Sequence, residues 1–555
     1  MGRKKVFQNS LNGGILSPTA YARVDLTKYY TSVADGLNTI CHPHGGQFKR
    51  RGTEFIADIG SDGRLARFSF NIAQSYILVF TLNNIAIYFN DVFIQNITTT
   101  FTLLEVRELG YAQSADTMII THKNHQPQAL IRDSGTGVWS ISNITLTNIP
   151  LFDYGSGNEP VISVTRGWPG YCTFFESRLW FAGLKSRPQT ITASKTNDFY
   201  NLSTGTGLAD EGIYDTLDTD QINPIVNIFP GRQIQIFTEG GEFSNTAKPI
   251  TPSDSSWTRH TNYGSTEGVR NELLDGSTLF MDRSGRNLRE FIYNFGEDGY
   301  TATSASTLAY DIISNPIDIT AVRGTSKDIS NLVLLVNDDG TMAAFNTLRV
   351  EEVAGWTRWV TQGTFKSIES VYDDLYFLVQ RAGGYYLEKA VDDLYTDSSI
   401  IAGAGGPTIT GLNHLEGQVV QILADNSVME SKTVVGGQVT TERTFTQVKV
   451  GLGYNAEIDP LPISPNVGDG SSVNREKRIL KSTYRVYETQ EMKVDGKVIA
   501  FRRFNVDKLD TATQPFSGIK EIRHLGYGRL QSYKVSSDTP TPFRLLSIET
   551  EVQTR

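Results

Sequence analysis

The chain has 555 residues, of which 39% are hydrophobic and 20% are charged, and its formal net charge is −9. This length exceeds what a single hydrophobic core serves and predicts about three or four domains, or fewer if one is a large repeat β-structure. Two cysteines, Cys41 and Cys172, are too few for a disulfide framework or a cysteine metal site, and the acidity opposes tight binding of phosphate backbones.

The composition favours a mainly β protein. Fifty glycines and 10% aromatic residues, together with frequent Thr, Val and Ile, are typical of short strands joined by tight turns. The polar start of the chain does not resemble a secretory signal, and apolar runs such as Tyr76 to Phe80 are too short to cross a bilayer. We therefore expect a soluble protein that folds in a reducing cytosol.

Residues 1–63 are predicted to form an extended amino-terminal arm and platform segment. Glycine pairs at Gly13-Gly14 and Gly45-Gly46, and the prolines at Pro18 and Pro43, disfavour a helix here. Residues 1–60 carry eight Lys/Arg against four Asp/Glu, so positive charge gathers at this end. Arg50 and Arg51 are equally well explained as side chains that are solvated or pair with local carboxylates, or as contacts to a neighbouring subunit or partner.

Residues 64–400 are predicted to form a β-propeller-like meander of antiparallel hairpins. Apolar runs alternate with turn residues, as in Ile77 to Thr81 followed by Ile85 to Phe89, and Leu332 to Val336 followed by Met342 to Phe345. Radial repetition into propeller blades lets so long a meander avoid open edges, although no strict sequence period is visible. The number of blades stays open.

Two further β-domains are expected after a Gly-rich break at residues 401–407: a small domain at 408–458 and a carboxyl-terminal domain at 471–555, each of sandwich or barrel type. The clearest late hairpin is Met492 to Val498, with an Asp-Gly turn. Residues 471–508 form a second basic patch, with ten Lys/Arg against five Asp/Glu. Short helices are allowed only at 301–310 and 474–482.

The common catalytic motifs are missing from the sequence, so an enzyme would have to use scattered carboxylates. A glycosidase could use two carboxylates of one acidic cluster as its acid and its nucleophile. The richest such cluster, named below, could also bind calcium, but the spacing of its residues does not match an EF-hand loop. An ordinary acidic loop is the favoured interpretation. The richest cluster comprises Asp210, Glu211, Asp215, Asp218 and Asp220.

Two histidine pairs are close enough in sequence to share a metal ion: His42 with His44, and His122 with His125. Neither has a nearby third ligand in sequence, so turn or packing histidines are favoured and no metal is predicted. Trp356 and Trp359 could stack on a sugar or base, but their spacing places the rings on opposite faces of a strand. A role in the core is favoured for them.

Several separated stretches form an ordered series along the chain. Those in the first third are Gly13-Gly14, Ser17-Pro18, Arg23-x-Asp25, Arg50 to Thr53, and Gln113 to Asp116 with His122, Pro127, Leu130 and Arg132. Those that follow are Arg178 to Gly183, Asp198 to Tyr200, Asn262 to Gly264, Asp282 to Gly285, Trp356 to Gly363 and His414 to Gly417. In their order and approximate spacing these stretches resemble tail tubular or nozzle proteins of short-tailed bacteriophages. The resemblance covers roughly residues 10–455 and leaves the role of residues 460–555 open.

The resemblance implies a non-enzymatic virion protein without cofactors. Six copies would form a tail tube or nozzle beneath the portal and the adaptor ring, retain packaged double-stranded DNA, conduct it at ejection and carry fibres or spikes. The protein would be made in the host cytoplasm and end in the virion tail. Because phosphates slide past neutral or acidic walls, we expect a lumen that is not strongly basic. The implied assembly-interface residues are Gly13, Gly14, Arg23, Asp25, Arg50, Arg51 and Gly52.

Two alternatives remain at this stage. The aromatic residues and the acidic loop suit a carbohydrate-binding or glycan-cleaving β-propeller. A soluble scaffold that joins other proteins without forming a pore would have the same composition. A glycan-binding screen distinguishes the carbohydrate alternative from a structural protein. The mass of the assembled particle distinguishes a scaffold from a nozzle, because a nozzle forms a closed ring.

Overall fold

The computed structural model describes residues 3–71, 73–155, 157–323, 331–351, 353–463, 466–467, 470–471, 475–502, 507 and 511–554. Its elements are mostly β-strands in antiparallel sheets, which confirms the predicted mainly β fold class. The chain divides into two compact units. Unit 1 comprises Met1–Gly60, Ser306–Ser314 and Thr320–Arg555, and unit 2 comprises Ser61–Ala305 and Asn315–Ile319.

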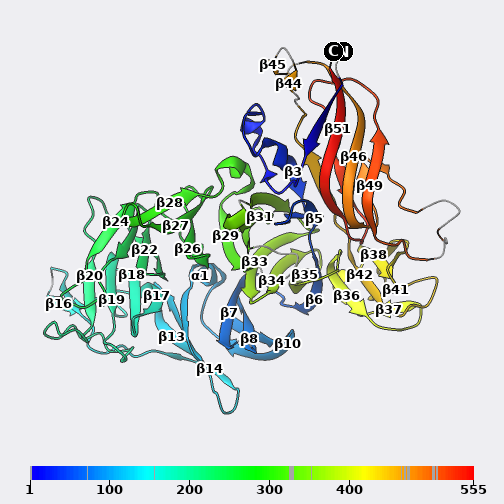
Figure 1. Cartoon of the computed structure of the whole chain (residues 1–555). Helices are drawn as coiled ribbons and strands as arrows, with labels where there is room; N and C mark the ends of the chain where they lie inside the picture. Colours follow the sequence, from blue (N-terminus) through cyan, green and yellow to red (C-terminus); the bar gives the residue numbers. More distant parts are fainter. Residues whose placement is uncertain are drawn as a thin grey trace. The chain divides into compact units, whose positions relative to one another are not determined.

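The described part of unit 2 contains five four-stranded antiparallel sheets, each made of four strands that follow one another in the chain (Figure 1). The first sheet contains β7 (Gly63–Asn71), β8 (Gln74–Thr81), β9 (Asn84–Phe89) and β10 (Val92–Thr98), and the second contains β11 (Gly110–Ser114), β12 (Thr117–His122), β13 (His125–Arg132) and β14 (Trp139–Asn143). The third contains β17 (Pro169–Phe175), β18 (Arg178–Leu184), β19 (Arg187–Ala193) and β20 (Ile213–Thr216), and the fourth contains β21 (Ile225–Pro230), β22 (Ile234–Thr238), β23 (Glu242–Asn245) and β24 (Trp257–Thr261). The fifth contains β25 (Glu272–Leu274), β26 (Ser277–Met281), β27 (Leu288–Asn294) and β28 (Gly299–Ser304). A short helix, α1 (Leu103–Glu108), joins the first two sheets, and β15 (Leu151–Asp153) pairs with β16 (Asn158–Pro160).

These five sheets form a β-propeller-like arrangement. Each sheet shares a buried apolar cluster with the next one in the chain, from the cluster of Phe68 and Trp139 to that of Phe237 and Phe291. The first strand of every sheet, or the residues just before it, contributes to the wall of one cavity. Because first strands surround a common space and neighbouring faces pack together, the sheets repeat radially, as predicted.

Unit 1 is built around three larger sheets. Their strand orders are β29-β30-β31-β32-β2-β3-β43-β50-β47-β48; β33-β34-β35-β6-β36-β42-β38-β39, with β40 beside β38; and β4-β5-β51-β46-β49, with β1 beside β51. The last segment of unit 1 begins at Thr320, within β29 (Pro316–Val322).

The strands of unit 1 have the following bounds: β1 (Arg3–Gln8), β2 (Gly14–Ile15), β3 (Ser32–Leu37), β4 (Thr39–Cys41), β5 (Gln47–Lys49), β6 (Gly52–Asp58), β29 (Pro316–Val322), β30 (Asn331–Asn337), β31 (Met342–Leu348), β32 (Val353–Trp359), β33 (Thr364–Val371), β34 (Asp374–Arg381), β35 (Gly384–Val391), β36 (Asp397–Ala402), β37 (Thr408–Thr410), β38 (Val419–Ala424), β39 (Ser427–Val428), β40 (Lys432–Thr433), β41 (Gln438–Thr440), β42 (Val448–Leu452), β43 (Ala456–Pro460), β44 (Asn466–Val467), β45 (Gly470–Ser471), β46 (Lys477–Thr489), β47 (Lys493–Val494), β48 (Lys497–Val498), β49 (Phe516–Arg523), β50 (Val535–Ser537) and β51 (Arg544–Thr554).

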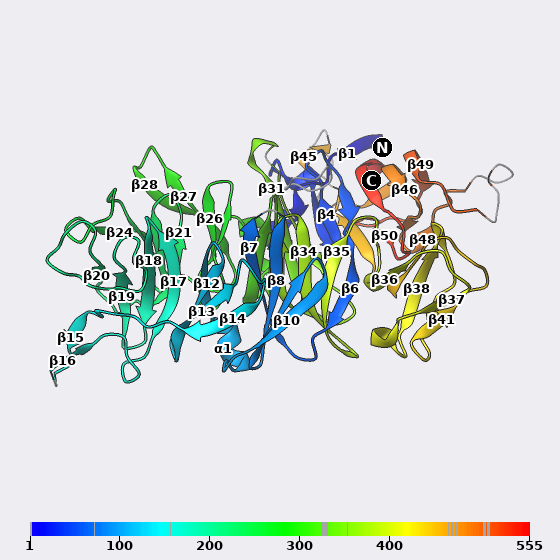
Figure 2. The ribbon, with the colours of Figure 1, turned by 90° about the horizontal axis from the view of Figure 1, so that it is seen from below.

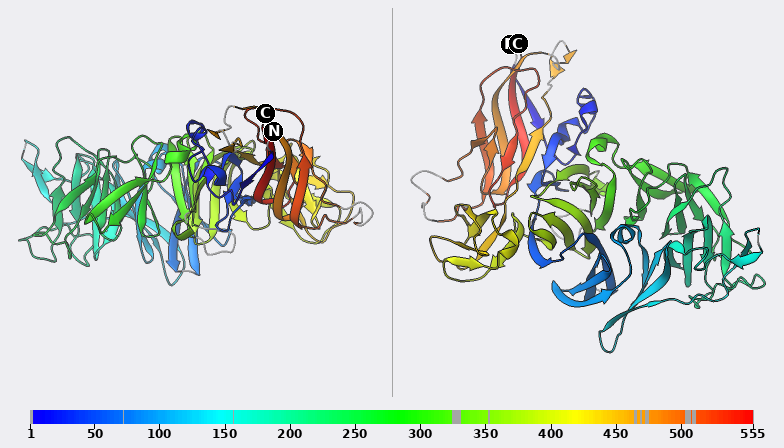
Figure 3. Two further views of the ribbon diagram at one scale, coloured as in Figure 1. Left: turned by 45° about the horizontal axis from the view of Figure 1, so that its top comes forward. Right: turned by 180° about the vertical axis from the view of Figure 1, so that it is seen from behind.

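The strands of residues 3–58 belong to the sheets of unit 1, so this segment is not the separate extended arm that the sequence predicts. β1 pairs antiparallel with β51, so the first and last described strands lie side by side (Figures 2 and 3). β2 lies between β32 and β3, and β6 lies between β35 and β36. The glycines and prolines disfavour an α-helix, and the described part of this segment forms two short 3-10 helices, over Pro18–Ala20 and Tyr29–Thr31, with no α-helix. Its extended backbone satisfies its hydrogen bonds by joining sheets whose other strands come from distant parts of the chain.

The division of the rest of the chain also differs from the predicted segments, since residues 64–400 belong partly to each unit. Residues 409–452 do have a buried apolar cluster of their own, around Leu412, Val434 and Val450. The carboxyl-terminal strands β46, β49 and β51 join β5 and β1 in one sheet, so residues 471–555 do not form their sheet alone.

The sequence patterns locate hairpins well and helices poorly. The three quoted hairpins correspond to β8–β9, β30–β31 and β47–β48, and the last has positive φ at both Asp495 and Gly496. The short helix allowed at 474–482 does not form, because the described part of that segment leads into the long strand β46. At 301–310 the chain forms β28 and a 3-10 helix over Thr307–Ile312. Among the described residues, no helix has the length and apolar character needed to cross a membrane.

Candidate functional site

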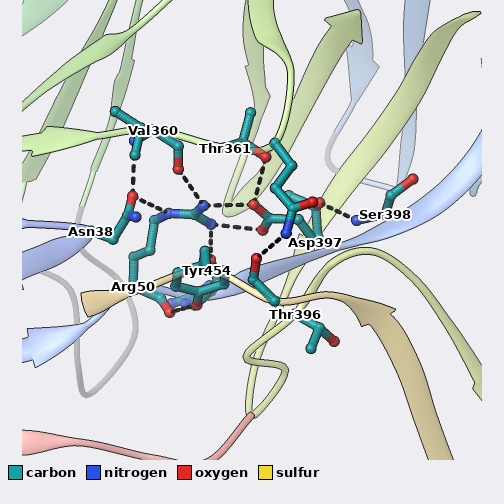
Figure 4. A network of polar contacts seen from close by, with 12 residues as sticks. Asn38, Arg50, Val360, Thr361, Thr396, Asp397, Ser398 and Tyr454 are labelled. Atoms are coloured by element: carbon teal, nitrogen blue, oxygen red, sulfur yellow. Dashed lines mark hydrogen bonds and ion pairs between the residues drawn. The ribbon is translucent and has the colours of Figure 1, made fainter. Parts of the chain in front are cut away.

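Arg50, one of the predicted assembly residues, lies at the centre of a buried ionic network in unit 1 (Figure 4). Its guanidinium forms a bidentate pair with Asp397, at 2.8 Å from Nη1 to Oδ1 and 2.7 Å from Nη2 to Oδ2. Nε donates to Asn38 Oδ1 at 3.0 Å, and the ring of Tyr454 lies 3.9 Å from the guanidinium carbon. Burial raises the pKa of Asp397, but the charge and hydrogen bonds of Arg50 outweigh burial and hold that pKa below its ordinary value.

The network continues to a second buried pair. Thr361 Oγ1 donates to Asp397 Oδ2 at 2.7 Å and accepts from Arg381 Nη1 at 2.9 Å. Arg381 in turn holds Glu388 through two contacts of 2.5 and 2.7 Å. Because one partner of each pair would be left charged and unpaired in the interior without the other, the network fixes the segment before β6 to β34, β35 and β36.

The glycines of the predicted assembly set also serve internal packing. A Cβ on Gly14 would lie 2.2 Å from the backbone nitrogen of Trp356, and its φ is +69°. A Cβ on Gly52 would lie 2.0 Å from the carbonyl oxygen of Thr396, and one on Gly13 would lie 2.5 Å from Ser32 Oγ. At Gly14 and Gly52 the close approach of a neighbouring backbone requires glycine, so these two positions have a structural role within the chain.

Arg23 and Asp25 are the members of the set with strongly exposed side chains, at 59% and 64%. They pair with each other, at 2.8 Å from Nη2 to Oδ2. Arg51 is less exposed and pairs with Asp392 at 2.8 Å. Of the seven predicted assembly residues, Arg23 and Asp25 therefore have the side chains that are most accessible in the single chain.

The cavity among the first strands of unit 2 has a volume of about 260 Å³. Three arginines contribute to its wall, and each has protein partners. Arg270 Nη2 lies 3.0 Å from Asp318 Oδ1, and Arg67 Nη2 lies 3.5 Å from Glu272 Oε2. Arg64 is buried and donates to two backbone carbonyls, and burial lowers its pKa. The cavity can hold a small polar molecule, but its charges are largely balanced.

The acidic cluster does not converge on a common point. Asp215 accepts hydrogen bonds from Ser255 Oγ and from Trp257 Nε1, the latter at 3.1 Å. Glu211 accepts from the backbone N–H groups of Gly207 and Leu208, at 2.7 and 2.9 Å, and Asp210 lies 3.7 Å from Lys195. These carboxylates organise a loop, in keeping with the acidic-loop interpretation. Asp218 and Asp220 are exposed.

The two histidine pairs differ in their surroundings. The ring of His42 stacks on Phe48 at 4.5 Å and lies 5.1 Å from His44, which fits packing histidines. His122 and His125 lie opposite each other across the β12–β13 turn and meet a carboxylate, Glu105 of α1. Within the described residues, Glu105, His122 and His125 form the cluster of three potential metal ligands. Sequence spacing could not reveal Glu105, because it lies 17 residues before His122.

The tryptophan pair belongs to the core, as favoured. Trp356 stacks on Phe345 at 4.6 Å, and Trp359 Nε1 donates to the carbonyl of Thr39 at 2.8 Å. Both rings are buried although they lie on opposite faces of β32, because unit 1 covers that strand on both faces.

Comparisons with known proteins bear little on this site. No family model matches the chain, and no curated protein matches its sequence. Solved structures with partial similarity include BamB from Moraxella catarrhalis, at 10% identity and a TM-score of 0.30 over 57% of this chain and 80% of that one. The Pan2 WD40 domain of Neurospora crassa has 9% identity and a TM-score of 0.36, over 62% and 96%, and BBS1N in complex with ARL6DN has 9% and 0.36, over 62% and 97%. Similarity this weak supports no statement about function.

Proposed function

We propose that this chain is a structural virion protein of a short-tailed bacteriophage, six copies of which form the tail tube or nozzle below the portal and the adaptor ring. In that role it retains packaged DNA, conducts it at ejection and docks fibres or spikes. The observation that carries the proposal is the ordered series of sequence segments between residues 10 and 455 that resembles this family.

The positions of these segments support a framework role. Arg178, at the start of β18, donates to the backbone carbonyls of Ser194 and Ala209 at 2.7 and 2.6 Å. Asp282 accepts from the backbone N–H of Ser284 at 3.1 Å within the Asp282 to Gly285 turn. His414 stacks on Phe55 at 3.9 Å. These polar residues form backbone hydrogen bonds or pack within the chain, as expected if the segments maintain a fold rather than carry out a reaction.

The charge distribution supports a conduit that does not hold DNA. Unit 2 carries 17 Lys/Arg against 26 Asp/Glu, so it accounts for the full net charge of −9, and unit 1 is neutral. Since like charges repel the phosphate backbone, neither unit offers the net positive charge that would bind DNA tightly. A continuous Lys/Arg-lined bore in the assembled ring would contradict this part of the proposal.

The proposal is tested by assembly with the adaptor ring. The purified full chain and the adaptor ring of the same virus are mixed, and the complex is examined by mass photometry and electron microscopy. We expect a closed ring of six chains on the adaptor, because ring contacts are completed on that platform. No association, or an open assembly of another number of chains, would overturn it. The isolated chain serves as the reference and is expected to be monomeric.

A carbohydrate-binding β-propeller is the second candidate, and the cavity of unit 2 is the observation that favours it. A glycan-binding screen of the full chain tests it. Binding that is weakened by Arg67→Ala, in the cavity wall, and unchanged by Asp215→Asn, in the acidic loop, would support this candidate. Absence of glycan binding would remove it and leave the nozzle proposal untouched.

A further inference from the structure

Three elements of unit 2 bring Glu105, His122 and His125 together. Glu105 is the third residue of α1, where its carboxylate accepts from the backbone N–H and the hydroxyl of Thr102, at 3.0 and 2.9 Å. His122 ends β12 and His125 begins β13, on the two sides of a two-residue turn. Residues that flank such a turn face each other on one side of the sheet, so both rings are aimed toward α1.

The spacing of the three side chains is close to that of ligands around one metal ion. His125 Nε2 lies 3.0 Å from Glu105 Oε2, and His122 Nδ1 lies 3.9 Å from Glu105 Oε1. The potential ligand atoms all lie within 4.8 Å of one another. Bonds of about 2.0–2.1 Å to a tetrahedral ion place ligand atoms about 3.3 Å apart, so small side-chain rotations suffice.

The surrounding groups hold the three side chains in place. Glu108 Oε2 lies 3.3 Å from His122 Nε2, so the imidazole can donate there while its other nitrogen faces Glu105. Asn124 Nδ2 donates to Glu105 Oε1 at 3.4 Å, and its backbone N–H donates to His122 Nδ1 at 3.2 Å. A carboxylate behind a histidine and hydrogen bonds to a ligating carboxylate are typical of metal centres. A bound ion would replace the Asn124 N–H as the partner of Nδ1.

We propose that Glu105, His122 and His125 form a binding site for a divalent transition-metal ion, with Zn²⁺ as the representative ion. Two imidazoles with one carboxylate suit Zn²⁺, whereas Mg²⁺ and Ca²⁺ prefer oxygen ligands alone. Glu105 and Glu108 together supply two negative charges beside two imidazoles, which a divalent cation neutralises. The ion would tie α1 to the β12–β13 turn, between the first two sheets of unit 2. This site is independent of the function proposed above.

Zinc titration of the full chain tests the site. The protein is treated with EDTA, dialysed free of chelator and titrated with ZnCl₂ in a calorimeter, with MgCl₂ in a parallel run. We expect saturable binding of one Zn²⁺ per chain, no comparable binding of Mg²⁺ and a higher Tm with Zn²⁺. X-ray absorption should show nitrogen and oxygen ligands without sulfur. Absence of saturable Zn²⁺ binding, or a sulfur ligand, would overturn the proposal.

Four variants assign the ligands. His125→Ala and Glu105→Gln should each weaken Zn²⁺ binding more than about 100-fold, because loss of a ligand exceeds the 10- to 100-fold typical of a supporting residue. Glu108→Gln should weaken it within that smaller range. His44→Ala, which removes an exposed histidine from the other pair, should leave binding unchanged. Binding retained by both His125→Ala and Glu105→Gln would overturn the assignment. The Tm of each metal-free variant checks that unit 2 still folds.

Discussion

Buried charge is the main feature of this protein at the scale of single residues. Arg50 and Asp397 each have 2% of their side chain exposed, and the Arg381–Glu388 pair is equally enclosed. Such pairs cost desolvation when they form, but removal of one partner leaves an uncompensated interior charge. The two pairs and Thr361 between them connect segments that are far apart in the chain.

Asp397→Asn should strongly destabilise unit 1. The substitution leaves the Arg50 charge in the interior without its carboxylate, which typically costs about 3–5 kcal/mol. The double variant Arg50→Met with Asp397→Leu should regain most of the lost stability, because it removes both charges. Thermal unfolding of these two variants and of the wild type checks this order. Arg23→Ala, which breaks an exposed pair, is the control and should leave Tm unchanged. A double variant as unstable as Asp397→Asn would contradict the interpretation.

Lys49→Met should change the pH dependence of stability. Burial lowers the pKa of Lys49 to about 7, although its Nζ donates to the Thr539 carbonyl at 2.7 Å. In the unfolded chain Lys49 keeps its proton up to its ordinary pKa of 10.5, whereas in the folded protein it loses the proton near pH 7. Between these values the unfolded state binds more protons, so the free energy of unfolding of the wild type rises with pH from about pH 7 to 10.5. Each pKa unit corresponds to about 1.4 kcal/mol.

The variant should therefore gain stability relative to the wild type below about pH 7, and the gain should shrink as the pH approaches 10. Tm measured from pH 6 to pH 10 for both proteins checks this, with Lys5→Met, an exposed lysine, as the control. A difference in Tm that does not vary with pH would refute the assignment of a strongly depressed pKa to Lys49.

At the scale of elements, the amino-terminal strands complete sheets formed by later parts of the chain. β1 covers one edge of β51 over six residue pairs, and Val6 packs with Ile479 and Val552 beneath it. β6 likewise completes the sheet of β33 to β35. An edge left open in either sheet would expose unpaired backbone groups and invite association with another chain. The amino-terminal strands β1 and β6 therefore cover strand edges that unit 1 would otherwise leave exposed.

Deletion of residues 1–8 should lower the Tm of unit 1 and promote self-association. The deletion exposes the edge of β51 from Ile548 to Gln553 and uncovers the apolar cluster around Val552. Light scattering after size-exclusion chromatography measures the association. The matched control is the double variant Arg3→Ala with Lys5→Ala, which removes the exposed ion pairs and keeps the strand. A monomeric deletion variant with wild-type Tm would show that β1 contributes little.

At the scale of the whole molecule, the chain separates into an acidic unit of radially repeated sheets and a neutral unit that contains both described ends. Each unit has apolar clusters of its own. In the four-stranded sheets of unit 2, each strand pairs with strands that are its neighbours in the chain. The sheets of unit 1 also join strands that are hundreds of residues apart. Local pairing forms with a smaller loop-closure cost, so we expect unit 2 to fold without unit 1.

A fragment of residues 61–319 should fold and unfold cooperatively by itself, because it contains all of unit 2. Near-ultraviolet circular dichroism should show fixed tryptophan environments, as expected for the buried Trp139 and Trp180. The same fragment should bind Zn²⁺ like the full chain. A fragment that lacks a cooperative transition would show that unit 2 depends on unit 1.

The sequence by itself determined the mainly β class, the hairpins and the core role of Trp356 and Trp359, because alternating burial and turn residues act over a few positions. Only the tertiary structure decided that Arg50 pairs with Asp397, that β1 joins β51 and that Glu105 meets His122 and His125. Arg50 and Asp397 are 347 positions apart, the β1–β51 pairs are 540 to 550 apart, and Glu105 lies 17 and 20 positions before the two histidines. No local pattern encodes which distant partner a charge or strand edge will meet. The predicted arm is wrong for the same reason: the glycines and prolines indicate extended backbone, but they do not indicate that its strands pair with β32, β35, β36, β43 and β51.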